Sequence, residues 1–180
     1  KVVSASKLRK SQSAVLAVRP FARKIEQMML HLSEAAEHPY LKQKSELKTI
    51  GYVVIGSDRG LCGGFNVNLH RFLDKTVAER QAKDFGLVVI GRKAKEYCQR
   101  RCYPIDTEYT GVGDNPSFDQ ARALGKLTTA AYDSGKYDEV WLVYSEFKSA
   151  MVQQPKLKRL LPVEQPVLAE DEVNIFALTD

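Results

Sequence analysis

Apolar positions in the first part of the chain recur in heptads from Leu8 onward. Two rows repeat every seven residues, which is the pattern of a left-handed coiled coil. The large apolar members of the rows, called the seam from here on, are Leu8, Val15, Val18, Ile25, Met29 and Leu32. The pattern predicts one long helix from Lys1 to about Glu37. Pro20 lies off the seam, where it can bend the helix without interrupting the rows.

The seam needs something to cover it. Burying a large apolar side chain contributes about 1.5–3 kcal/mol, so a bare seam would forfeit roughly 9–18 kcal/mol as an upper bound, comparable with the stability of a whole domain, about 5–15 kcal/mol. No second heptad stretch of this length occurs before Asp180. We therefore expect a partner helix from another chain or from sequence absent here. The alternative is an ordinary amphipathic helix that lies on its own sheet.

After His38 the pattern changes to short apolar runs that alternate with helical spacing. Strands are predicted at about 49–55, 87–90, 103–109, 140–144 and 157–161, and helices at about 65–77, 91–98 and 117–134. Ser117 and Gln120 form a capping box for the last helix, which Gly135 ends. The alternation predicts a Rossmann-like α/β body with a mostly parallel sheet. The fold class is therefore α/β with a long N-terminal helix that forms half of a coiled coil, and the expected domains are 1–38 and 39–180.

Charge divides the chain in the same way. The net charge is +5, but residues 1–24 carry seven basic side chains and no acidic one, which leaves −2 for the rest. A basic arm can bind nucleic acid, yet these residues are spread along a helix with no aromatic residue before Phe21. A solvated or subunit-facing surface is the better interpretation, and no nucleic-acid partner is expected.

Composition excludes a membrane span, because no apolar stretch approaches the roughly 18 residues that one needs. Any membrane association would therefore come through partners. The chain shows no signal-peptide pattern, which favours a cytoplasmic protein. Its cysteines Cys62, Cys98 and Cys102 are expected to be reduced thiols.

Between the first strand and the following helix lies a loop that contains three glycines. It reads Ser57, Asp58, Arg59, Gly60, Leu61, Cys62, Gly63, Gly64, Phe65, Asn66. Phosphate groups bind at such turns in α/β proteins. However, a P-loop needs Lys and then Ser or Thr after its last glycine, and Gly64 is followed by Phe65 and Asn66. The dinucleotide spacing is absent as well, so we expect no cofactor.

Cys62 is the candidate nucleophile of this loop, since a helix N-terminus and Arg59 would favour its thiolate. A nucleophile also needs a base, and His31, His38 and His70 offer no credible one. We expect Cys62 to be a buried, inert thiol. An α/β enzyme that uses Cys62 or the Gly60–Gly64 loop remains the alternative.

The other residues of the loop are interpreted structurally. We expect Asp58 and Arg59 to fix the turn through neighbouring residues, and the glycines to let backbone approach backbone. Cys98 and Cys102 are one helical turn apart, but no further Cys or His cluster completes a metal site. No catalytic, cofactor or metal residue is therefore assigned.

The segment from Ser57 to Leu69 closely resembles the signature segment of the gamma subunit of F-type ATP synthases, the central rotor shaft. Further matches follow the same order along the chain. They are the segments 3–10, 19–22, 38–41 and 160–162. The stretch from Val163 to Val173 is too short for the cysteine-bearing insertion of chloroplast relatives, so a thiol-switched enzyme is not expected. The glycine pair followed by Phe65 and Asn66 resembles the bacterial type.

The resemblance implies a non-catalytic subunit that couples ion-driven rotation of the membrane c-ring to ATP synthesis or hydrolysis at the alpha/beta hexamer. It implies that the N-terminal helix pairs with the family's long C-terminal helix, absent here, inside the ring of alpha and beta subunits. The body would lie beside the epsilon subunit and on the c-ring, at the cytoplasmic face of the bacterial plasma membrane. Residues of the arm that would face alpha and beta are Lys7, Arg9, Lys10 and Arg19.

Overall fold

The computed structural model describes residues 2–35, 37–80, 82–113, 116–149 and 151–163. Within the first helix, the side chains of residues 2–5, 7 and 30–35 lie outside the described part. The chain separates into two units with a boundary between Leu41 and Lys42. The first unit contains helix α1, and the second contains the whole sheet, so each is described by itself.

Helix α1 (Val2–Ala35) is continuous through Pro20, as the heptad pattern predicts, and the short 3-10 turn η1 (Pro39–Leu41) follows it. The seam side chains Leu8, Val15, Val18, Ile25 and Met29 are 41–60% exposed. The side chain of Leu32 lies outside the described part. Leu16, Phe21 and Met28, which are not members of the seam, are 53–67% exposed. The helix therefore carries more bare apolar surface than its two heptad rows alone.

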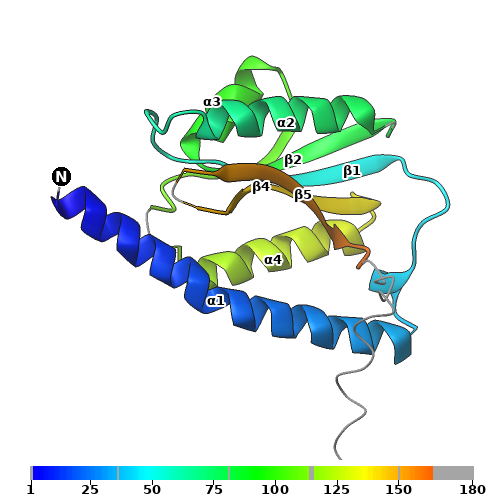
Figure 1. Ribbon diagram of the computed structural model, residues 1–180. Coiled ribbons are helices and arrows are strands. Elements are labelled where there is room, and N and C mark those ends of the chain that lie inside the picture. The colour runs from blue at the N-terminus through cyan, green and yellow to red at the C-terminus, as the bar shows by residue number, and fades with distance from the viewer. Residues whose placement is uncertain (1, 36, 81, 114–115, 150, 164–180) are drawn as a thin grey trace, which may run out of the picture. The chain divides into compact units, whose positions relative to one another are not determined.

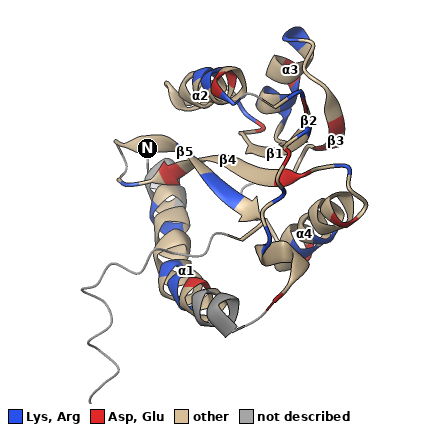
Figure 2. Cartoon of the chain, turned by 90° about the vertical axis from the view of Figure 1, so that its right-hand side faces the viewer, with Lys and Arg blue, Asp and Glu red and all other residues tan. Residues whose placement is uncertain are grey.

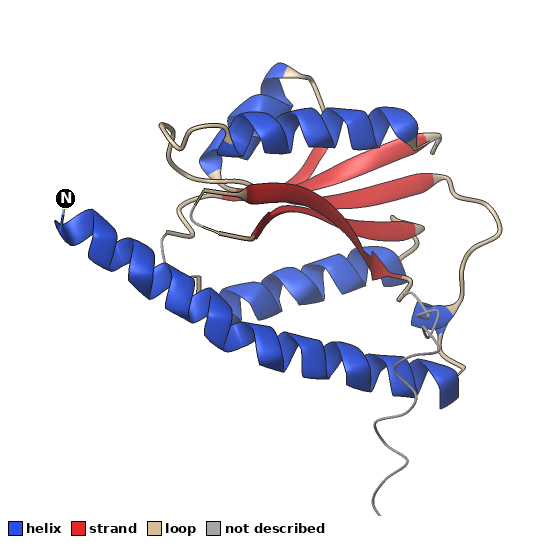
Figure 3. Ribbon diagram, viewed as in Figure 1, coloured by secondary structure: helices blue, strands red, loops and turns tan. Residues whose placement is uncertain are grey.

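The second unit is built on a five-stranded sheet of order β3-β2-β1-β4-β5 (Figures 1 and 3). The strands are β1 (Thr49–Ile55), β2 (Asp84–Ile90), β3 (Ile105–Tyr109), β4 (Glu139–Phe147) and β5 (Gln153–Leu161). The first four run parallel to their neighbours, and β5 pairs antiparallel with β4 at the edge. Figure 1 shows helices α2 (Phe65–Glu79) and α3 (Arg92–Arg100) on one face and α4 (Phe118–Asp133) on the other.

This architecture confirms the predicted α/β class. The first strand has the predicted bounds, and the capping box of Ser117 and Gln120 is present, with Gly135 at φ 75° after α4. The last strand is longer than predicted and includes Pro155. A proline fits there because β5 is an edge strand, where a missing backbone N–H need not break a ladder.

The larger core lies between the sheet and the pair α2 and α3. Strand side chains Tyr52, Val54, Leu87 and Val89 pack there with Leu69, Leu73, Ala94 and Cys98 of the helices. Every one of these side chains is at most 1% exposed. The continuous apolar runs of β1 and β2 are thus explained, since parallel strands covered on both faces need no polar alternation.

On the opposite face, one tyrosine closes the sheet over a pair of glycines. Gly51 and Gly86 are register partners on β1 and β2, and the ring of Tyr137 lies against both. Tyr137 is 1% exposed, and its hydroxyl donates a hydrogen bond to Asp106 of β3. Burial, the largest cause, and this carboxylate raise the pKa of Tyr137. Lys136 Nζ lies 2.7 Å from the other oxygen of Asp106.

We expect Gly86→Ala to lower the free energy of unfolding by about 1–3 kcal/mol, because overpacking a filled site strains it. A Cβ at Gly86 would overlap Asp106 Oδ2 and lie 3.0 Å from Tyr137 Cε1. The matched control is Gly125→Ala in α4, where a Cβ meets nothing within 4 Å. That change should instead stabilise by about 0.5–1 kcal/mol. Urea unfolding of both variants tests whether the space at Gly86 is filled by Asp106 and Tyr137. Equal free energies of unfolding for the two variants would contradict this packing.

Candidate functional site

Three loops meet at the carboxyl edge of the parallel strands, which is the edge where α/β proteins place their binding residues. They are the segment 56–64 after β1, Gly91 at the start of α3 after β2, and the segment from Thr110 after β3. Residues 114 and 115 of the third loop lie outside the described part. The glycine-containing loop predicted from the sequence is thus one of three neighbouring loops at this edge, where the parallel strand β4 ends as well.

The carboxylate of Asp58 connects all three loops. It accepts hydrogen bonds from the backbone N–H groups of Arg92 at 3.0 Å, Gly111 at 3.1 Å and Gly113 at 3.3 Å. The Arg92 Nε donates to the Asp58 carbonyl at 3.2 Å. The Arg92 amide, the largest cause, then those of Gly111 and Gly113, hold the pKa of this carboxyl below its usual value.

Asp58 also caps a helix that has no cap of its own. Helix α3 begins after Gly91, which has no side chain to accept from the first-turn amides. Asp58, from a different loop, accepts from the first of them and places negative charge at the helix N-terminus. The expectation that Asp58 fixes a turn through neighbouring residues therefore understates its reach, since its partners are 34 to 55 residues away in sequence.

Within the loop itself, Ser57 and Asn66 hold the two ends together. Ser57 Oγ donates to the Arg59 carbonyl at 2.6 Å, and Asn66 Nδ2 donates to Ser57 Oγ at 2.8 Å. Asn66 Nδ2 also lies 3.1 Å from Cys62 Sγ. These contacts keep the loop in one shape at the start of α2.

The glycines that allow close backbone approach are not those of the motif. A Cβ at Gly91, which has φ 94°, would lie 2.5 Å from the Gly56 carbonyl oxygen, and one at Gly56 would lie 2.7 Å from Ala94 Cβ. In the motif, a Cβ at Gly60 would meet only Lys93 at 3.6 Å, and Gly63 is required by its φ of +57° rather than by space. The sequence shows that each of them directly follows an apolar strand, but not that the two strand ends lie side by side.

The prediction that Cys62 is buried is wrong. Cys62 is exposed, and so is Cys102, whereas Cys98 is buried. The loop turns outward at Leu61, which has φ 59° and is fully exposed, so the next side chain cannot reach the core. Burial raises the pKa of the Cys98 thiol to about 11.

The described groups that contact Cys62 do not supply a general base. Its sulfur contacts the Asn66 amide and, at 3.9 Å, the Arg59 carbonyl, and neither group can accept a proton as a general base. In the described part of the chain no group of three or more His, Cys, Asp or Glu residues could hold a metal ion.

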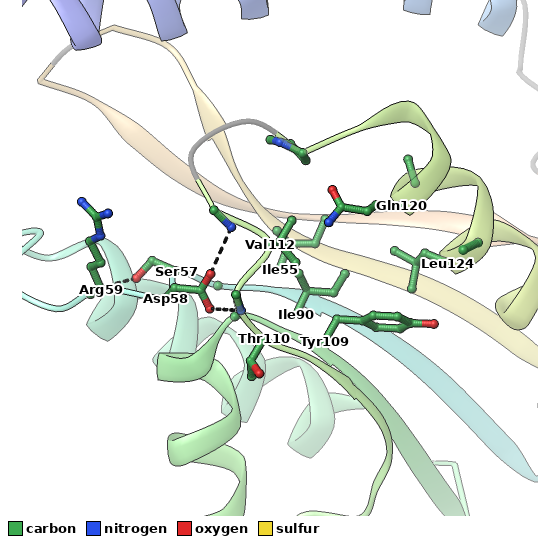
Figure 4. A pocket seen from close by; sticks show the side chains of 17 residues that line it. Ile55, Ser57, Asp58, Arg59, Ile90, Tyr109, Thr110, Val112, Gln120 and Leu124 are labelled. Carbon is green, nitrogen blue, oxygen red and sulfur yellow. Dashed lines mark hydrogen bonds between the residues drawn. The ribbon is translucent and has the colours of Figure 1, made fainter.

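A cleft of about 790 Å³ opens beside the Asp58 loops, between the strand ends and the first turns of α4. Figure 4 shows Ile55, Ile90 and Val112 facing Leu124 and Gln120 across it. Its walls are mainly apolar, and the Asp58 carboxylate at its margin is already engaged by three amides. The other polar side chains that line it include Ser57, Arg59, Tyr109 and Thr110.

The arm residues predicted to meet other subunits lie along α1, whose ribbon in Figure 2 carries several stretches coloured for Lys and Arg. Arg9 and Lys10 are exposed and Arg19 is partly exposed. The side chain of Lys7 lies outside the described part. None of the helices in the described ranges is both long and apolar enough to cross a membrane.

Comparison with known proteins gives one consistent result. A family model described as ATP synthase matches residues 1–177. The ATP synthase gamma chain of Desulfitobacterium hafniense is 41% identical over 179 residues, which cover 98% of this chain and 63% of that protein. That of Desulforamulus reducens is 43% identical over 169 residues, which cover 92% and 59%. The chain thus spans about three fifths of the length of these curated relatives.

Solved structures that resemble this chain also come from ATP synthases. The central stalk and c-ring structure of the Tetrahymena thermophila mitochondrial ATP synthase contains a chain that matches with a TM-score of 0.71 and 29% identity, over 89% of this chain and 70% of that one. A rotor chain of the Euglena gracilis mitochondrial ATP synthase matches with a TM-score of 0.52 at 16% identity, over 89% and 60%. The second likeness concerns the fold alone.

We expect Asp58→Ala to loosen all three loops at once, since three amides lose their acceptor. The free energy of unfolding should fall by about 1–2 kcal/mol, and hydrogen exchange at the Arg92, Gly111 and Gly113 amides should accelerate together. Arg59→Ala is the matched control, because its side chain makes no hydrogen bond with another described residue.

The effect of Asp58→Ala should depend on pH in one direction. Because folding lowers the pKa of this carboxyl, its stabilisation is fully present above the unfolded value of about 3.9 and is lost as pH falls through the folded value. The stability difference between wild type and variant should therefore be constant near neutrality and shrink below about pH 4. A difference that grows in acid would contradict this assignment.

Proposed function

The chain belongs to the ATP synthase family, whose model it matches over residues 1–177, and on that premise we propose that it is part of a gamma subunit. Its function would be that of the central-stalk rotor, which couples ion-driven rotation of the c-ring to ATP synthesis or hydrolysis at the alpha/beta hexamer. The observation that carries the proposal is α1, a helix of 34 residues whose described seam side chains are all bare.

The bare seam calls for a helical partner. Its five described members are 41–60% exposed in this chain, although a heptad seam is stable only when a second helix covers it. In a gamma subunit the partner would be the long C-terminal helix. Relatives are longer than this chain by about two fifths of their length, which leaves room for such a helix.

Leu16, Phe21 and Met28 extend the apolar surface beyond the seam. A two-helix coiled coil would leave these three side chains exposed to solvent. In a shaft enclosed by a ring of alpha and beta subunits, they would instead pack against those subunits. The basic residues Arg9 and Lys10 are exposed on the same helix. With Lys7 and Arg19, we propose them as contacts to alpha and beta.

The body would be the part that transmits force and not a catalytic domain. Asp58 ties three loops of the sheet together, and the described groups that contact the Cys62 sulfur, the Asn66 amide and the Arg59 carbonyl, are not bases. We therefore propose the loop from Ser57 to Gly64 as a structural joint, and the chain as a non-catalytic subunit without a cofactor. No contact in the described residues favours the alternative of an enzyme that uses Cys62 or the Gly60–Gly64 loop.

The proposal places the protein beside the epsilon subunit and the c-ring, as a peripheral protein at the cytoplasmic face of the bacterial plasma membrane. Two curated bacterial gamma chains above 40% identity support the bacterial assignment. The Tetrahymena match supports the position, since that structure is titled as central stalk and c-ring.

A charge in the seam tests the shaft. In a complete gamma subunit that carries this chain, Ile25→Lys should reduce the yield of complex assembled with alpha, beta and epsilon at least tenfold, because an unpaired ammonium would be buried between helices. Lys24→Ala, exposed and next to the seam, is the matched control. Normal assembly and coupled ATP synthesis in Ile25→Lys would exclude the shaft.

Charge reversal on the arm tests the proposed subunit contacts separately. We expect the combined variant Lys7→Glu, Arg9→Glu and Lys10→Glu to assemble but to show ATP-driven torque and coupled ATP synthesis reduced several-fold. Lys126→Glu, an exposed residue of α4, serves as the control for charge alone. Unchanged torque and synthesis in the triple variant would refute these contacts.

A further inference from the structure

His70 is a buried histidine on α2. It is 9% exposed, and its Nε2 is buried without a hydrogen-bond partner among the described residues. Its ring stacks on the ring of Tyr97 from α3, with centroids 4.0 Å apart and an interplanar angle of 9°. The neutral imidazole thus packs between the two helices through its ring face, as an aromatic side chain would.

One turn later on α2, Asp74 is the polar centre of the same helix contact. Its two oxygens accept hydrogen bonds from the hydroxyl groups of Tyr97 at 2.5 Å and Tyr103 at 2.9 Å. Arg101 Nη2 lies 3.5 Å from the same carboxylate. Asp74 therefore ties α2 to the end of α3 and to the segment before β3.

Protonation of His70 is disfavoured in the closed arrangement. Burial, the largest cause, and Arg100 of α3 lower the pKa of His70, while Asp74 raises it. Strands β4 and β5 also contact α2. On these strands, Glu139 pairs with Arg159 at 3.6 Å and with Arg80, at the C-terminal end of α2, at 3.4 Å.

We propose that His70 and Asp74 form an acid-sensitive latch between α2 and α3. In the neutral state, His70 stacks on Tyr97 while Tyr97 donates to Asp74. A proton on Nε2 creates a charged donor that has no acceptor in the stack. Residues four apart on a helix are neighbours on its surface, so the carboxylate within reach is Asp74. When His70 turns to Asp74, Tyr97 loses its stacking partner and must share its acceptor with a charged donor, and the C-terminal end of α3 is released.

The N-terminal end of α3 is held independently by Asp58, whose pKa is low. The two ends should therefore respond to different pH ranges. Mild acid, below the usual histidine value of about 6.5, releases the end near Tyr97. The Asp58 end stays attached until a carboxylate is protonated, so α3 opens about a fixed N-terminus.

Native-state hydrogen exchange of the whole chain, corrected for intrinsic rates, tests the latch. Opening of amides near Tyr97 and Cys98 should increase about tenfold between pH 7.5 and pH 5.5, while the Arg92 amide stays protected. His70→Phe keeps a stacking ring that cannot be protonated, and should reduce the increase to less than twofold. His70→Leu, a second variant without a titrating group, should do the same.

A direct titration separates the latch from general loosening. In nitrogen-15 NMR spectra, the His70 imidazole should titrate below pH 6.5, and the Tyr97 resonances should change with the same midpoint. Tyr97→Phe should loosen α3 already at neutral pH and leave little further change in acid. The proposal would be overturned if exchange of the amides near Tyr97 and Cys98 did not depend on pH in the wild type, or if it increased equally in His70→Phe.

Discussion

One carboxylate sets the geometry of the body. Parallel strands end at a common edge, and each of the first three continues into a loop that sheet hydrogen bonds no longer hold. Asp58 accepts from Arg92, Gly111 and Gly113, so a single ionised side chain replaces three separate anchors. Gly56 and Gly91 approach each other beside it, where each donates its backbone N–H to the neighbouring strand, Gly56 to Ile90 and Gly91 to Tyr109. A helix without a cap of its own is in this way fixed to a strand that is not adjacent in sequence.

The sequence predicted the regular parts of the fold well, because periodicity reports local burial. β1 and the capping box of α4 were located correctly. The extension of β5 through Pro155 could not be seen, since only edge position makes a proline acceptable there. In the loop, the motif drew attention to Gly60 and Gly64, but the contact glycines are Gly56 and Gly91, whose need is visible only when two strands lie side by side.

Burial of single residues outside regular elements was the least predictable property. Cys62 follows an outward turn at Leu61, and no local pattern indicates a positive φ at a leucine. The partners of Asp58 were equally hidden, since a short-range expectation cannot find amides more than 30 residues away. By contrast, the prediction that α1 pairs with another helix used only the heptad spacing of one helix, and the exposure of its described seam side chains is in keeping with that spacing.

The glycine pair under Tyr137 has a consequence for how the sheet assembles. Gly51 and Gly86 face each other only when β1 and β2 are in their native register. A shift of one residue would turn other side chains toward the ring, because neighbouring residues of a strand point to opposite faces. Tyr137 lies more than 50 residues after Gly86 in sequence, and its ring can therefore pack on β1 and β2 only when these strands are in their native register. Its hydroxyl then donates a hydrogen bond to Asp106 on β3. The packing of this one side chain therefore depends on the positions of β1, β2 and β3 together.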